Sequence, residues 1–221
     1  MTPEYDVEHK KQEVNFVEWS KITVAADYDV KWILTALKEL EQERVDVLDV
    51  GGGIGALACI LADSADNIFV DVVDNSPLAR QQFIEHERLY LIYENFLKLD
   101  AGAASQYDLI IFRTVLHHII GASSAETLRL QNQALKKTHE LLKPDGKLFV
   151  IENFYDPLIF NDITGEIIFQ CTKLRLLAPL FRSLGANTAG EGVRFRSLDR
   201  WVQMFADNKF EMVGELLHEE W

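Results

Sequence analysis

The chain has 221 residues, and its 22 Lys and Arg against 35 Asp and Glu give a formal net charge of −13. A hydrophobic content of 48% and a charged content of 26% are ordinary for a globular protein, so disordered and collagen-like chains are excluded. The negative charge argues against nucleic acid and anionic membranes as partners, and we expect neither. Cys59 and Cys171 lie in apolar runs without disulfide or metal-ligand spacing, which favours a cytoplasmic protein. We expect no signal peptide and no membrane span.

The first half of the chain alternates apolar runs with amphipathic stretches, which is typical of βαβ units. The predicted elements are, in chain order, a helix over 27–41, a strand over 45–50, a helix over 56–62, a strand over 68–74, a helix over 77–88 and a strand over 89–93. The third helix is expected to begin at Ser76-Pro77, because serine can cap a helix and proline suits its first position.

The second half continues the pattern after a gap near residue 100. We predict a strand over 107–112, a helix from Ser123 or Ser124 to 142, a strand over 148–152, a mostly helical stretch over 159–184, a helix over 198–207 and a strand over 211–217. The Lys143–Gly146 segment is predicted as a turn that ends the preceding helix. Strands linked by helices predict one α/β domain over 1–221, a doubly wound, mostly parallel sheet with helices on both faces.

The strongest motif is the glycine run Gly51–Gly55, between the first strand and the next helix. Glycines there allow positive φ and close approach of a ligand to the backbone, and the helix N-terminus offers unpaired N–H groups. Read as Gly51-x-Gly53-x-x-Ala56, the run matches a dinucleotide fingerprint. Asp74 ends the second strand, where a carboxylate can accept hydrogen bonds from both ribose hydroxyls of a nucleotide cofactor. A tight turn without a ligand is an alternative interpretation of the glycine run.

Read as Asp-x-Gly-x-Gly-x-Gly, the same run resembles motif I of the class I S-adenosylmethionine-dependent methyltransferases. The segment 107–119, YDLIIFRTVLHHI, resembles the "FDLI…vLHHI" segment of many small-molecule methyltransferases. The segment LLKPDGKL at 141–148 is similar to the family's "LLKPGG-x-L" step into the fifth strand. The resemblance keeps the family order over 45–152 and implies a Rossmann-like sheet of order 3-2-1-4-5-(7)-6. The seventh strand is uncertain, because 210–217 is the one clear candidate for the last two.

The resemblance implies S-adenosyl-L-methionine as the cofactor and gives roles to residues around the first strand. Gly51, Gly52 and Gly53 would make room for the methionine part of the cofactor, and Asp49 would shape their loop. Arg113, at the exit of the fourth strand, would lie near the methionine carboxylate.

The adenosine end of the cofactor is assigned to the exits of the second and third strands. Asp74 would hold the ribose, with Asn75 beside the adenine. Asn95 and Phe96 would bracket the adenine. Asn95 stands where the family more often has aspartate, and its carbonyl can still accept a hydrogen bond from the adenine amino group.

His117 and His118 follow the fourth strand, where the resemblance places the methyl acceptor. Histidine is a suitable base at neutral pH, so either residue is a candidate catalytic base, and the sequence does not choose between them. The alternative is that the pair only orients its loop and caps the next helix. Two adjacent histidines without a third ligand nearby do not predict a metal site.

The region 153–209 is where such enzymes usually build the acceptor pocket. Phe154 and Tyr155 are candidate lining residues, against the alternative that they only pack in the core. From 171 to 200 the chain carries six basic and two acidic residues. Because arginine pairs well with carboxylate and phosphate, Arg194 and Arg196 suggest an anionic acceptor, against the alternative of a solvated face.

These observations predict a cytoplasmic S-adenosylmethionine-dependent methyltransferase acting on an O or N atom of a small, anionic molecule. The alternatives are a cofactor-binding protein without turnover and an NAD(P)-dependent oxidoreductase. Residues 1–26 are expected to form a lid or a tail. An unpaired sheet edge would favour a homodimer. The sequence does not name the acceptor.

Overall fold

A computed structural model describes residues 28–100, 106–154, 163–173 and 192–214. The chain divides into two compact units, and we describe each by itself. Unit 1 comprises 1–113 and 140–150, and unit 2 comprises 114–139 and 151–221. The predicted lid at 1–26, Tyr155 and the two ends of the helical stretch predicted over 159–184 lie outside the described residues. No helix among the described residues is long and apolar enough to cross a membrane.

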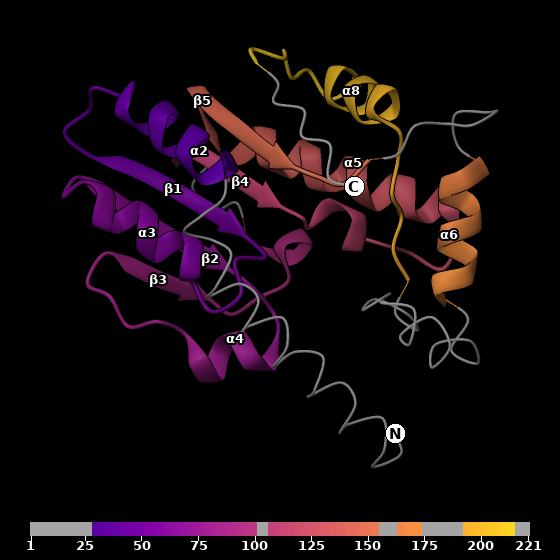
Figure 1. The fold of residues 1–221 in the computed structure, drawn as a ribbon, viewed down its shortest axis with the longest axis horizontal. Coiled ribbons are helices and arrows are strands. Elements are labelled where there is room, and N and C mark those ends of the chain that lie inside the picture. Colours follow the sequence, from indigo (N-terminus) through magenta and orange to yellow (C-terminus); the bar gives the residue numbers. More distant parts are fainter. Residues whose placement is uncertain (1–27, 101–105, 155–162, 174–191, 215–221) are drawn as a thin grey trace. The chain divides into compact units, whose positions relative to one another are not determined.

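Unit 1 is built on a five-stranded sheet of order β3-β2-β1-β4-β5 (Figure 1). The strands are β1 (Val45–Val50), β2 (Ile68–Val73), β3 (Leu89–Ile92), β4 (Tyr107–Arg113) and β5 (Leu142–Ile151). β1 pairs in parallel with both β2 and β4, and β2 pairs in parallel with β3. This order confirms the predicted Rossmann-like α/β fold.

The two central strands explain why the sequence forms a sheet here. β1 and β4 are almost completely buried, as the near-continuous Val, Leu and Ile of a parallel strand covered on both faces predicts. Val50 lies opposite Val73 in β2 and Phe112 in β4, and Val73 lies opposite Ile92 in β3. The four strands therefore end in register, and the loops that follow them start at one edge of the sheet.

Two helices of unit 1 lie side by side in Figure 1, and they contact each other. Helix α2 (Tyr28–Lys38) buries Val30, Ile33 and Leu37, which share one face at helical spacing. Helix α3 (Ala56–Ser64) buries small and aliphatic side chains and packs against β2 and β3. Its small residues allow a close approach to the sheet.

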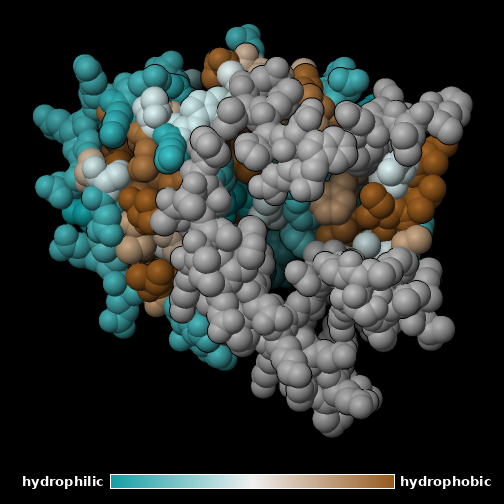
Figure 2. Space-filling view, in the orientation of Figure 1, coloured by the Kyte–Doolittle hydropathy of each residue, from teal (hydrophilic) through white to brown (hydrophobic). Residues whose placement is uncertain are grey.

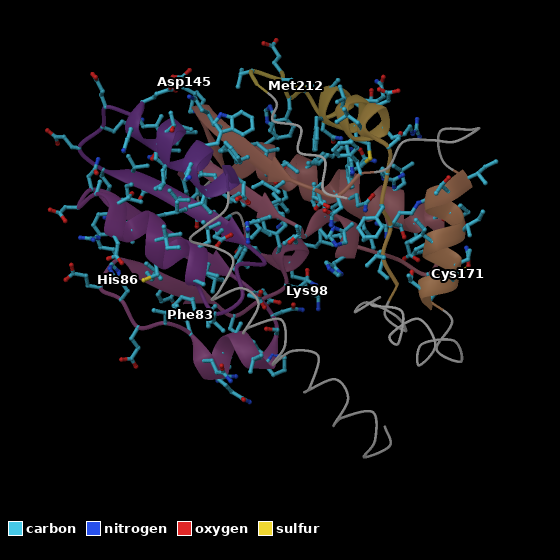
Figure 3. The ribbon with its side chains drawn as sticks, viewed as in Figure 1. Phe83, His86, Lys98, Asp145, Cys171 and Met212 are labelled. Carbon is cyan, nitrogen blue, oxygen red and sulfur yellow. The ribbon has the colours of Figure 1, made fainter. Side chains whose placement is uncertain are left out.

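Helix α4 (Pro77–Gln82) begins as predicted, with the Ser76 hydroxyl accepting a hydrogen bond from the Ala79 N–H. The predicted extension to residue 88 is wrong. Phe83 leaves the helix in an extended conformation, and the next N–H, of Ile84, donates to the Ile54 carbonyl at 2.9 Å. Phe83 and His86, labelled in Figure 3, lie in this irregular segment before β3. Contacts with a distant part of the chain have overridden the local helical pattern.

The turn predicted at Lys143–Gly146 is part of β5, which begins at Leu142 rather than at 148. The Lys143 ammonium group donates to Asp108 at 2.7 Å and to Asp46 at 3.4 Å, so it binds acids of both central strands. A Cβ atom on Gly146 would lie 2.9 Å from the Tyr107 carbonyl oxygen. Close backbone approach and this ion cluster explain why the segment pairs with the sheet.

Unit 2 contains most of helix α5 (Ser124–Leu141), helix α6 (Ile163–Lys173) and helix α8 (Leu198–Asp207). The bounds of α8 are those predicted, and the Ser197 hydroxyl caps its first turn. Figure 2 shows hydrophobic side chains gathered over α6, where Ile163 and Ile167 are 54% and 58% exposed.

The strand predicted over 211–217 is not observed where the structure describes it. Helix α8 ends at Asp207, Lys209 takes a positive φ of 66°, and the Phe210 N–H donates to the Phe205 carbonyl. The helix thus ends with one residue in the left-handed conformation, and the following residues 211–214 have no regular structure. The remaining residues, 215–217, lie outside the described part of the chain.

Candidate active site

The loop between β1 and α3 is formed by glycines in the left-handed region. Gly51, Gly53 and Gly55 have φ values of 69°, 58° and 83°. The Gly51 N–H donates to the Val73 carbonyl at 2.8 Å, which ties the start of the loop to the end of β2. Gly55 occupies the N-cap of α3. Residues with a side chain rarely adopt these conformations, so the backbone path itself requires glycine.

Asp49 lies directly beneath this loop. It is 1% exposed, and its Oδ2 atom has no hydrogen-bond partner among the described residues. A Cβ atom on Gly52 would overlap the Asp49 carboxyl group and lie 2.9 Å from Val72 Cγ1. Burial raises the pKa of Asp49 to about 7, with Arg113 lowering it and Asp74 raising it further. The loop therefore packs on a buried, poorly solvated carboxyl group.

Asp74 connects two of the loops at this edge of the sheet. Its Oδ2 atom accepts a hydrogen bond from the Gly53 N–H at 3.0 Å, and its Oδ1 atom accepts one from the Ser76 N–H at 2.7 Å. It thereby fixes the glycine loop relative to the start of α4. The neighbouring Asn75 is exposed. The predicted binding of a ribose by Asp74 stays a prediction.

Asn95 fixes the backbone that follows β3. The Asn95 side-chain oxygen accepts a hydrogen bond from the Leu97 N–H at 2.9 Å and caps the short helix η1 (Phe96–Lys98). Phe96 is buried and packs edge-to-face on Phe112 of β4, with ring centroids 5.3 Å apart. Asn95 and Phe96 are thus fixed in place beside the strand ends, and their predicted contacts with adenine are untested.

Arg113, the last residue of β4, is paired with a residue that the sequence reasoning missed. Its Nε atom donates to Asp29 Oδ2 at 2.7 Å, and the two side chains are only 13% and 16% exposed. Asp29 lies in the first turn of α2, 84 residues away along the chain. In the sequence, Asp29 is marked only as an acid at a helix start. The helix dipole alone explains an acid there, so the residue does not suggest a function.

In unit 2, His117 is paired with Glu152, which the sequence reasoning also missed. His117 Nδ1 lies 2.6 Å from Glu152 Oε2, and both side chains are 5% exposed. The other carboxylate oxygen, Oε1, accepts a hydrogen bond from the Leu116 N–H at 2.6 Å. Because an ionised carboxylate only accepts, Nδ1 carries the proton and Nε2 is left as the basic nitrogen. This is the arrangement that orients an imidazole base.

The His117 ring is also packed between two other rings. The centroids of His118 and Phe195 lie 4.2 Å and 4.7 Å from it. The His117 carbonyl accepts a hydrogen bond from the Arg194 N–H at 2.9 Å. Desolvation and then His117 lower the pKa of His118, although part of this residue is exposed to solvent. Of the two histidines, His117 is the one whose ring is held by a carboxylate, and the predicted role of either residue as a base is untested.

The predicted acceptor residues have partners inside unit 2. Arg196 donates through Nε and Nη2 to the Gln131 side-chain oxygen at 2.9 and 2.7 Å. Arg194 Nη2 lies 3.5 Å from Glu166 Oε2. Phe154 is partly exposed and forms an isolated parallel bridge with Arg196. Both arginines are buried, so these contacts indicate a packing role, and their predicted role toward an acceptor is untested.

No group of three or more His, Cys, Asp or Glu side chains that could hold a metal ion occurs among the described residues. The two cysteines of the chain are both free and partly buried.

The central part of the chain matches a known family model. Residues 48–148 match the family model described as a methyltransferase domain. This segment contains the glycine loop, the ends of β2, β3 and β4, and most of β5. This match, over less than half of the chain, agrees with the predicted resemblance to the class I S-adenosylmethionine-dependent methyltransferases.

Individual relatives are distant. The chain is 24% identical over 224 residues to the compactin diketide synthase mlcB of Penicillium citrinum, with 92% of this chain and 8% of that protein covered. It is 26% identical over 171 residues to O-methyltransferase 12 of Dictyostelium discoideum, with 75% of this chain and 39% of that protein covered. The chain thus spans well under half the length of these two relatives.

Among solved structures, the fold is similar to that of human N-acetylserotonin methyltransferase in complex with S-adenosylmethionine. The TM-score is 0.53 at 21% identity, and the alignment covers 83% of this chain and 46% of that one. At this identity the likeness supports the fold alone.

Proposed function

We propose that this chain binds S-adenosylmethionine at the β1–α3 loop and transfers its methyl group to an oxygen or nitrogen atom of a small molecule. The observation that carries the proposal is the glycine loop packed on Asp49, in a segment that matches a methyltransferase domain. The similar human structure is described as a complex with the same cofactor, and the relative from Dictyostelium discoideum is named an O-methyltransferase.

The residues at the strand ends fit such a cofactor chemically. Open space at the Cβ position of Gly53, in a loop that lies on the buried, unpartnered carboxyl oxygen of Asp49, fits a cradle for a ligand. Asp74 and Asn95 supply fixed oxygen acceptors, and Phe96, held in place by its edge-to-face contact with Phe112, supplies an aromatic ring beside them. The bound cofactor supplies an electrophilic methyl group on a sulfonium, and the protein supplies binding and orientation.

The His117–Glu152 pair is proposed to take up the proton that the acceptor loses. Glu152 holds the imidazole through Nδ1 and stabilises the positive charge that forms when Nε2 accepts a proton. His118 is not assigned this role, because the Glu152 carboxylate holds the ring of His117 instead. An acceptor hydroxyl or amine is the class of group that needs such a base.

The activity is tested with S-adenosylmethionine labelled in its methyl group and a panel of phenols, carboxylic acids and amines. We expect transfer of label to at least one member of the panel. Cofactor binding without transfer to any acceptor would favour the alternative of a binding protein without turnover. The proposed anionic acceptor, which the local excess of basic residues supports, is tested within the panel by acids paired with their neutral amides.

Glu152→Gln tests the proposed base. The amide cannot stabilise a positively charged imidazole, so we expect kcat to fall about 100-fold, within the range typical of general-base catalysis. The cofactor Kd should stay within about twofold, and the activity lost should not return at higher pH. Glu211→Gln, at an exposed position of the same unit, is the matched control. Unchanged kcat in Glu152→Gln would remove His117 and Glu152 from the mechanism.

A further inference from the structure

Asp49 is an unusual acid because one of its carboxyl oxygens is buried without a hydrogen-bond partner among the described residues. It is buried beneath the glycine loop, and its Oδ2 atom has no hydrogen-bond partner there. Gly52 and Val72 close around this oxygen, as the contacts of a hypothetical Cβ on Gly52 show. Burying an ionised carboxylate without a partner costs free energy, and such a group usually binds a proton and becomes neutral instead.

The charged groups around Asp49 do not remove this cost. Asp74, at the end of β2, adds a like charge, and its own oxygens are used by two backbone N–H groups. Arg113, at the end of β4, favours the ionised form of Asp49, but its Nε atom is paired with Asp29 of α2. The balance of burial, Asp74 and Arg113 raises the pKa of Asp49 to about 7.

We propose that the free protein holds Asp49 protonated and uncharged, and that binding of cationic S-adenosylmethionine releases this proton to solvent. The inference rests on the proposed function, because it assigns a property to the same cofactor site. The only bond broken is the carboxyl O–H bond, and no covalent bond forms between Asp49 and the ligand. A positive ligand next to the carboxyl group favours its ionised form, so binding and ionisation are coupled.

The coupling has a defined sign. The complex binds fewer protons than the free protein, so cofactor affinity must rise with pH below about 7 and level off above it. Between pH 5.5 and 6.5 the association constant should rise about eightfold, the increase expected for one group with a pKa of about 7. In this range an α-amino group, with an ordinary pKa near 8, remains protonated, so the ligand itself contributes little.

The test is isothermal titration of the full chain with S-adenosylmethionine at pH 6, repeated in buffers of different ionisation enthalpy. The slope of the observed enthalpy counts the protons released, and we expect about 0.9 per ligand. Asp49→Asn should release almost none. Asp66→Asn, which removes a fully exposed acid of unit 1, should behave like the wild type.

Each outcome decides the question. Binding with no proton release, or equal release from wild type and Asp49→Asn, would overturn the inference and leave the proposed function standing. No binding at any pH would overturn the proposed function, and the inference with it. If Asp49→Asn does not bind, carbon-detected NMR of the free proteins decides. One aspartate carboxyl signal should titrate near pH 7 in the wild type and be missing in the variant.

Discussion

At the scale of single residues, the site depends on positions where a side chain is excluded. Gly52 is the sharpest case, because its missing Cβ leaves the space that the Asp49 carboxyl group fills. Gly53, one residue later, has a positive φ but open space around its Cβ position. The two glycines therefore serve different purposes, one steric and one conformational.

Gly52→Ala should disturb the site through this contact. We expect about 1–3 kcal/mol of destabilisation from overpacking, and a loss of S-adenosylmethionine affinity of at least about tenfold. Chemical unfolding and calorimetric titration measure the two effects. Gly53→Ala is the control for stability, since it adds about 1–2 kcal/mol of backbone strain without the overlap. A Gly52→Ala protein with wild-type stability and affinity would contradict this description of the loop.

Residues that act in pairs were the hardest to predict from the sequence. Asp49, Asp74 and the glycines could be predicted as site residues because they lie in one short motif or at a fixed distance from it. Glu152 is 35 residues from His117, and Asp29 is 84 residues from Arg113. Neither partner has a local pattern that marks it, because the contact exists only after the strands and helices have been brought together.

At the scale of elements, local signals predicted starts better than ends. Ser76-Pro77 and Ser197 mark the beginnings of α4 and α8, and both serines cap as expected. The end of α4 was missed because Phe83 and Ile84 leave the helix to contact Gly55 and Ile54. The early start of β5 was missed because Lys143 binds acids of β1 and β4. Both errors come from contacts between residues far apart in sequence.

The Ser76 cap gives a prediction at this scale. Ser76→Ala removes the acceptor for the Ala79 N–H, and we expect a loss of about 1 kcal/mol in the free energy of unfolding. Gln82→Ala, at the exposed last residue of the same helix, should change stability by less than about 0.5 kcal/mol. Urea titrations of the three proteins would show the difference. Equal stability of wild type and Ser76→Ala would mean that the cap contributes nothing to α4.

At the scale of the whole molecule, the net charge of −13 is less informative than the placement of individual acids. Asp49 is the example with a measurable consequence. Its pKa is raised from 3.8 to about 7, so between these values the folded protein binds more protons there than the unfolded chain does. The contribution of Asp49 to the free energy of unfolding must therefore fall as pH rises from about 4 to about 7.

Asp49→Asn should remove this contribution. We expect the variant to gain stability relative to the wild type between pH 5 and pH 8, by an amount on the order of 3 kcal/mol. Thermal unfolding of both free proteins across this range measures the difference, and comparison at each pH cancels the other titrating groups. A difference that does not change with pH would mean that Asp49 is ionised in the folded protein throughout.

We propose the β1–α3 loop as a site for S-adenosylmethionine. Calorimetric titration of the full chain with S-adenosylmethionine and, separately, with NADH tests it most directly. We predict saturable binding of one S-adenosylmethionine per chain, weakened in Gly52→Ala, and no binding of NADH. Binding of NADH without any response to S-adenosylmethionine would exclude this cofactor site and favour an oxidoreductase.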